Sequence, residues 1–248
     1  MPTPMHHRLQ LEIQRQPNDH TCGPTCLQAV YRYYGDNIGL DTIISEIPSF
    51  EEGGTLAVML GRHALRRGYD AMIYTFNLQV FDPTWFHQSG IDLKERLRSQ
   101  IGVSTNAKLI TACEAYVEFL ELGGEIRMQD LNAALIRKYL GRSVPILTGL
   151  SSTYLYREPR EIGTSGQPDD LRGTPSGHFV VFHGYDQVER TVLLADPFLP
   201  NPLSSSHHYV VPLDRAVCSI LLGIVTYDAN LLIIRPADLY REFSGNDS

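Results

Sequence analysis

The chain has 248 residues, of which 43% are hydrophobic and 20% are charged, and its formal net charge at pH 7 is −7. This composition is typical of a globular protein with enough apolar residues for a buried core. An acidic chain without a polybasic run is a poor partner for nucleic acid or for an anionic membrane. The longest apolar runs fall short of the ~20 residues that cross a bilayer, so we expect no membrane span.

The four cysteines are Cys22, Cys26, Cys113 and Cys218, and the first ten residues lack the apolar core of a signal peptide. Few cysteines and no signal indicate free thiols and a cytoplasmic protein. Cys22 and Cys26 lie four residues apart on one helix face, which is awkward geometry for a disulfide. The sequence has no cysteine or histidine pair with the spacing of a zinc site, so we predict no metal and no cofactor.

The first half of the chain has mainly helical periodicity. A short leading strand is predicted over residues 8–14, where apolar and polar residues alternate. Helices are predicted over 22–34, 41–47, 53–67, 93–100, 105–122 and 129–140, and strands over 69–76 and 125–128. Residues 77–90 form a connector between these patterns.

The second half of the chain is rich in strand patterns. Strands are predicted over 144–150, 178–185, 191–196, 209–212, 223–227 and 231–234, with a short helix over 213–221. The polar stretch 156–177 reads as a long loop and is a candidate lid or wall of a binding site. Helices first and strands later predict an α+β fold with an antiparallel sheet.

The helix that begins near Cys22 is the first candidate for chemistry. Thr21 is a capping residue type, and Pro24 is tolerated in a first helical turn. The positive end of the helix dipole favours a thiolate, which is the form of cysteine that attacks a carbonyl. Gln16, six residues upstream, can lend a side-chain N–H to a two-donor oxyanion hole with the backbone N–H of Cys22. The alternative is that Cys22 is a small buried hydrophobe.

A predicted hairpin over 178–196 supplies the second half of the candidate site. With a turn at 186–190, His178 pairs near residue 198, so His178 and Asp196 meet at the open end of the hairpin. A carboxylate there holds one imidazole nitrogen and leaves the other free, as the third member of a catalytic triad does. His183 is the rival imidazole, but an odd separation from His178 turns it toward the opposite face.

Three blocks of sequence resemble the papain-like cysteine peptidases, and among them the C39 and C39-like group. They are Gln16 with D-H-T-C-G-P-T-C-L around Cys22, G-H-F-V-V-F-H-G-Y-D around His178, and A-D-P around Asp196. The resemblance implies that Cys22 is the nucleophile, His178 the general base, Asp196 its orienting partner and Gln16 an oxyanion donor. It also implies a papain-like fold with a helical lobe that carries the nucleophile and a sheet lobe that carries the base.

We expect a stand-alone enzyme, without a transporter segment, whose single domain over residues 1–248 has a helical insertion at about 77–140 and acts on a peptide or protein substrate. The predicted reaction is hydrolysis of a peptide or amide bond through an acyl-enzyme. Two alternatives stay open: an acyltransferase or deamidase that uses the same triad, and a papain-like domain that binds peptides without cutting them. The sequence does not distinguish these three functions or determine the oligomeric state.

Overall fold

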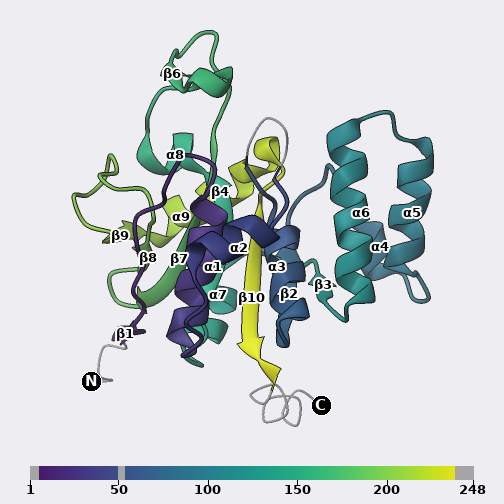
Figure 1. Ribbon diagram of the computed structural model, residues 1–248, viewed down its shortest axis with the longest axis horizontal. Helices are drawn as coiled ribbons and strands as arrows, with labels where there is room; N and C mark the ends of the chain where they lie inside the picture. The colour runs from purple at the N-terminus through teal and green to yellow at the C-terminus, as the bar shows by residue number, and fades with distance from the viewer. Residues whose placement is uncertain (1–5, 50–53, 238–248) are drawn as a thin grey trace.

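The computed structural model of the protein describes residues 6–49 and 54–237. Its main sheet has the strand order β3-β2-β10-β4-β7-β8-β9, and β1 pairs with β7 outside that path (Figure 1). The strands of this sheet are β1 (His6–Arg8), β2 (Tyr69–Thr75), β3 (Glu125–Arg127), β4 (Ile146–Ser151), β7 (Gly177–Asp186), β8 (Thr191–Ala195), β9 (His208–Pro212) and β10 (Asn230–Pro236). The paired strands are antiparallel except β2 and β3, which run parallel.

Helices of the first half lie beside this sheet, and the predicted α+β class is confirmed. The α-helices are α1 (Cys22–Tyr33), α2 (Leu40–Glu46), α3 (Ala57–Arg66), α4 (Thr84–His87), α5 (Leu93–Val103), α6 (Ala107–Glu121), α7 (Ala133–Leu140), α8 (Ser152–Tyr156) and α9 (Leu213–Leu222). Helices α4, α5 and α6 form a group at one side of the molecule, remote from β8 and β9 (Figure 1).

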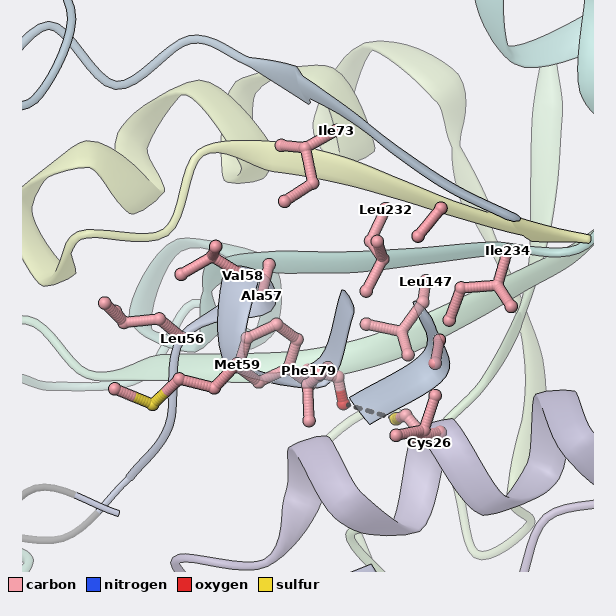
Figure 2. Close-up of a cluster of buried hydrophobic side chains, with 14 of the residues drawn as sticks. Cys26, Leu56, Ala57, Val58, Met59, Ile73, Leu147, Phe179, Leu232 and Ile234 are labelled. Atoms are coloured by element: carbon pink, nitrogen blue, oxygen red, sulfur yellow. Dashed lines mark hydrogen bonds between the residues drawn. The ribbon is translucent and has the colours of Figure 1, made fainter. Parts of the chain in front are cut away.

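Both faces of strand β7 are buried, which is why its sequence is a near-continuous apolar run. Phe179 and Val181 belong to the cluster that includes α1 and α3, whereas Val180 and Phe182 belong to the cluster under α7 and α9. Alternate residues of a strand point to opposite faces, so β7 joins the two cores. Figure 2 shows part of the first cluster, with Cys26 of α1 pointing toward Phe179.

Two predicted strands are wrong. Residues 9–14 have no regular structure, and only His6–Arg8 form β1. Leu9, Leu11 and Ile13 are nevertheless buried, so an irregular segment packed on the core produced the alternating pattern. Residues 223–227 do not form a strand, because Gly223–Thr226 is a 3₁₀ helix (η2).

The predicted loop at 156–177 contains some regular structure of its own. A small hairpin joins β5 (Glu161–Ile162) to β6 (Gln167–Pro168), with a 3₁₀ turn, η1 (Gly163–Ser165), between them. It projects from the body of the molecule above α8 (Figure 1). The stretch is therefore an excursion from the sheet that returns at Gly177, one residue before His178.

Candidate active site

Cys22 is the first residue of α1, as the sequence predicts, and its side chain is buried with 8% exposure. Thr21 precedes the helix, but its hydroxyl makes no capping bond to the first turn and donates instead to the Asn18 carbonyl at 3.0 Å. The backbone N–H groups at the start of a helix have no partner inside the helix. The Cys22 thiol therefore lies where unpaired donors and the helix dipole both favour negative charge.

Two contacts fix the start of α1 against its neighbours. One turn after Cys22, the Cys26 Sγ donates to the Phe179 carbonyl oxygen of β7 at 3.2 Å, the bond drawn as a dashed line in Figure 2. At Gly23 an added Cβ would lie 2.6 Å from Thr55 Cγ2, so only glycine allows this close approach. Because Phe179 follows His178 directly, these contacts set the thiol of α1 beside the strand that carries the imidazole.

The hairpin of β7 and β8 brings His178 and Asp196 together. Val181 pairs with Ala195, which is the predicted register at this end of the hairpin. His178 Nε2 lies 2.8 Å from Asp196 Oδ1, and Asp196 is fully buried. The remaining ring nitrogen, Nδ1, is left open by Asp196, and Cys22 also acts to raise the pKa of His178.

Asp196 accepts hydrogen bonds from three groups in addition to His178. Tyr156 and Tyr209 both donate to Oδ2, at 2.7 and 2.5 Å, and the backbone N–H of Phe198 donates to Oδ1 at 2.9 Å. Burial alone would raise the pKa of this carboxyl, but His178 and the two hydroxyls hold the pKa below its usual value. Asp196 is therefore a stable anion despite having no exposure to solvent.

The same charge decides the state of His178. Burial works to lower the pKa of His178, but the Asp196 carboxylate and the hydrogen bonds to Asp196 and Cys22 outweigh burial and raise that pKa to about 10. His178 is therefore an imidazolium at neutral pH. A positive ring between a carboxylate and a thiol is suited to hold a thiolate and later to release a proton.

Gln16 is held close to Asp196 by its backbone. Its N–H donates to the carbonyl of Pro197, the residue after Asp196, at 3.0 Å. Its side-chain Nε2 donates to the Asn18 carbonyl at 2.9 Å, while Oε1 is buried without a partner. Exchanging the two amide atoms would set Oε1 against the Asn18 oxygen, so the second N–H of Nε2 is the one available for another acceptor.

Cys22 and His178 share a cavity of about 210 Å³. Its walls come from the Cys22 segment, the approach to α3, the start of β7, helix α6 and the segment before β10. The lining residues are Asp19, His20, Cys22, Gly54, Thr55, Leu56, Lys108, Gly177, His178, Phe179, Thr226 and Asp228. Gln16 is not among them, and the stretch 156–177 contributes only Gly177, so that stretch does not form the predicted wall of this cavity.

Three residues of the site were not predicted from the sequence. Tyr156 and Tyr209 lie where the sequence suggests a loop edge and a strand, and nothing there indicates that both hydroxyls converge on one carboxylate. Asp228 follows a segment that was predicted as a strand, which hid the turn that brings its side chain to the cavity. A polar residue two positions before β10 was the one available signal.

His183 lies elsewhere, with partners of its own. Its Nδ1 is 3.1 Å from the Leu9 carbonyl oxygen, and its Nε2 is 3.1 Å from His208 Nδ1. Burial lowers the pKa of His183 to about 4. Among the described residues, no group of three or more His, Cys, Asp or Glu side chains is placed to hold a metal ion. Over the same part of the chain, no helix has both the length and the apolar character to cross a membrane.

The Peptidase_C39 like family model matches residues 8–213, which include Gln16, Cys22, His178 and Asp196. A match over most of the chain shows the family, and the chain belongs to the C39-like peptidases. Membership supports a peptidase-type function. A search of curated proteins found no match.

Solved structures resemble the protein at low sequence identity. One is a double glycine motif protease from an AMS/PCAT transporter in complex with the leader peptide, at 12% identity and TM-score 0.44, covering 96% of this chain and 100% of that one. Another is Xylellain, a cysteine protease from Xylella fastidiosa, at 11% identity and TM-score 0.45, covering 95% and 90%. A third is the peptidase domain of Streptococcus ComA, at 14% identity and TM-score 0.43, covering 92% and 99%.

Proposed function

We propose that the protein is a cysteine peptidase that cleaves a peptide or amide bond through Cys22, His178 and Asp196. The observation that carries this proposal is the 2.8 Å contact between His178 Nε2 and Asp196 Oδ1, because it orients a histidine that shares a cavity with Cys22. We further propose that residues 1–248 form one domain with a helical insertion at about 77–140, since α4, α5 and α6 form a group at one side of the molecule (Figure 1).

The reaction follows from the positions of these groups. Cys22 Sγ, with its proton on His178, attacks the carbonyl carbon of the substrate and forms a tetrahedral oxyanion. His178 then gives a proton to the leaving amine as the C–N bond breaks, which leaves an acyl group on Cys22. Water, activated by the now neutral His178, attacks the acyl carbon and frees the thiol. Asp196 stays ionised throughout and keeps Nε2 occupied so that Nδ1 faces the thiol.

The oxyanion needs donors, and two groups are candidates. The backbone N–H of Cys22 lies at the start of α1, and the second N–H of Gln16 Nε2 is the other candidate. Loss of one such donor in comparable enzymes costs roughly 10²–10³ in rate. We therefore assign Gln16 as an oxyanion donor, and its tether to Pro197 fixes it beside the acid that orients His178.

The acyl-enzyme is the species to detect. Wild-type protein treated with a small activated ester should gain one acyl group, located on Cys22 by peptide mapping, and lose it again as water releases the product. Cys22→Ala should gain none, and His178→Ala should acylate at least ~100-fold more slowly, because general base catalysis contributes that much or more. Acylation of Cys22→Ala at the wild-type rate would overturn the assignment.

The fate of the acyl group separates the related functions. Release by water alone supports a hydrolase, formation of a conjugate that depends on an added amine indicates an acyltransferase, and ammonia from a glutamine peptide indicates a deamidase. A protein that binds peptides but never acylates would be a binding module. Of these, hydrolysis agrees with the family to which the chain belongs.

A further inference from the structure

Asp228 is a buried carboxyl group of the cavity that the proposed chemistry does not use. It lies between η2 and β10, it is 5% exposed, and it lines the cavity that holds Cys22 and His178. Within the described part of the chain, the one hydrogen bond to its carboxylate comes from Thr226 Oγ1, which donates to Oδ2 at 2.7 Å. No donor to Oδ1 is found there, and Oδ1 is not among the fully buried atoms without a partner, so this oxygen keeps some exposure to the cavity.

The backbone is shaped to hold this carboxyl group in place. A Cβ added to Gly149 of β4 would lie 2.5 Å from Asp228 Oδ1, and one added to Gly177 of β7 would overlap Oδ2. Glycines on two adjacent strands thus form the notch that receives the carboxyl group, next to His178. The residues on either side, Tyr227 and Ala229, have φ values of 68° and 61°, a left-handed conformation that is unfavourable for both.

The charges of Lys108 and His178 act on Asp228 but do not outweigh its burial. Burial raises the pKa of Asp228 to about 7, although Thr226, Lys108 and His178 all act to lower it. Lys108 is an exposed residue of α6 whose Nζ lies 4.8 Å from the centre of the Tyr227 ring. The Lys108 charge therefore acts from the rim of the cavity and does not offset the burial of the carboxyl group.

We propose that Asp228 is a specificity residue, and that the cleft prefers substrates that place an ammonium or guanidinium group, such as a lysine or arginine side chain, against it close to the scissile bond. This inference rests on the proposed function, because it assigns a substrate class to the cleft of Cys22. A cation in the notch supplies the donors that Oδ1 lacks and neutralises a charge that is already desolvated. Substrates with an acidic side chain at the same place are disfavoured by repulsion.

Matched alkylating probes test the preference without a known substrate. Chloroacetamides that carry an ammonium, a methyl or a carboxylate group at the end of linkers of equal length differ only in charge, and linkers of two, four and six carbons cover the unknown span. The rate of Cys22 modification is followed by intact mass and peptide mapping at pH 8. The exposed Cys218 of the same molecule reports the intrinsic reactivity of each probe.

The ammonium probe of the best length should modify Cys22 at least about tenfold faster than its methyl counterpart after division by the Cys218 rates, which corresponds to about 1.4 kcal/mol. In Asp228→Asn this ratio should fall below about two. Asp19→Asn removes the same charge from an exposed residue of the same cavity and should keep the ratio. Equal ammonium and methyl rates at every length would overturn the inference.

A second test keeps Asp228 in place and varies the pH. As pH falls from 8 to 6, Asp228 takes up a proton and the ratio should decrease. The other titratable groups that face Asp228 or line the cavity are Lys108, Tyr116, His178, Asp19 and His20. The Asp19→Asn protein is therefore titrated in parallel, so that a contribution from Asp19 can be recognised. An ammonium-to-methyl ratio that does not change with pH in the wild type and in Asp19→Asn contradicts the role of Asp228.

The two proposals fail in different ways. A Cys22 that reacts ahead of Cys218 with the neutral probe but shows no charge preference leaves the peptidase proposal standing and overturns the substrate class. A Cys22 that reacts with none of the probes overturns both proposals.

Discussion

The hairpin of β7 and β8 carries two buried histidines whose environments lead to different protonation states. His178 meets the carboxylate of Asp196 and has a pKa raised to about 10. His183, five residues further along β7, meets a backbone carbonyl and a second imidazole, and its pKa is lowered to about 4. Both side chains are almost fully buried, with 8% and 1% exposure, so burial does not distinguish them.

The difference lies in the partner. A buried imidazole without an anion is more stable when neutral, and a buried imidazole beside an ionised carboxylate is more stable when charged. Burial works to raise the pKa of Asp196, but His178 and the hydroxyls of Tyr209 and Tyr156 together hold that pKa below its usual value, so the carboxylate stays ionised. The site is thus a charge network built on one carboxylate, whereas the His183 environment joins β7 to the segment before α1 and to β9.

Replacement of Asp196 by asparagine should have the largest effect. The isosteric amide removes the anion, so His178 loses the interaction that raises its pKa and its ring is no longer held in the required tautomer. In enzymes with a comparable triad this change costs about 10⁴ in rate. We expect Cys22 acylation to slow by roughly 10²–10⁴-fold, measured with the activated ester. An Asp196→Asn protein that retains wild-type rates would show that Asp196 does not orient the base.

The His183 environment should influence the stability of the fold at low pH. Its folded pKa of about 4 lies below the unfolded value near 6.5, so the unfolded chain binds the extra proton between these limits and stability falls as pH falls through them. His178 acts in the opposite direction, because its folded pKa of about 10 lies above the unfolded value. The stability that protonated His178 contributes to the fold is complete below pH 6.5 and is lost as pH rises toward 10.

The matched variant is His183→Leu. Between pH 6.5 and 4.5 the unfolding free energy of the variant should fall by about 2 kcal/mol less than that of the wild type. This value is smaller than the one that the whole difference between the folded and unfolded pKa of His183 would give. Denaturant titrations across this range measure the effect, while acylation of Cys22 in the variant controls for an intact site. If the unfolding free energies of the wild type and the variant fall equally between pH 6.5 and 4.5, His183 is not held neutral in the folded protein.

Tyr209→Phe should have the smallest effect of these substitutions. It removes one of the two hydroxyls that donate to Asp196 Oδ2, while Tyr156 continues to stabilise the anion. A hydrogen bond to a charged group contributes roughly 1.5–3 kcal/mol, so we expect a slower acylation by about tenfold and a lower stability. The double replacement with Tyr156→Phe should cost more than the sum of the two. Additive effects would mean that the hydroxyls act independently.

Much of this site could be predicted from local sequence. The helix that carries Cys22 begins where the sequence indicates, and the hairpin register brings His178 to Asp196 because strand pairing near a short turn follows from spacing alone. The donors to Asp196 could not be predicted, because Tyr156 and Tyr209 converge through tertiary packing. Asp228 was hidden for a related reason: an apolar run at 223–227 reads as a strand, yet Val225 is 54% exposed and the segment is a 3₁₀ turn.

The most direct measurement is the rate at which iodoacetamide alkylates Cys22 and Cys218 at pH 7. Both rates are followed in the same sample, once for the wild type and once for His178→Ala. Cys22 is buried and Cys218 is exposed, so access alone favours Cys218. If His178 activates the thiol, Cys22 of the wild type reacts first, and in His178→Ala its rate drops at least about tenfold while the Cys218 rate is unchanged. A Cys22 rate that is below that of Cys218 in the wild type, or that is the same in both proteins, would contradict the account.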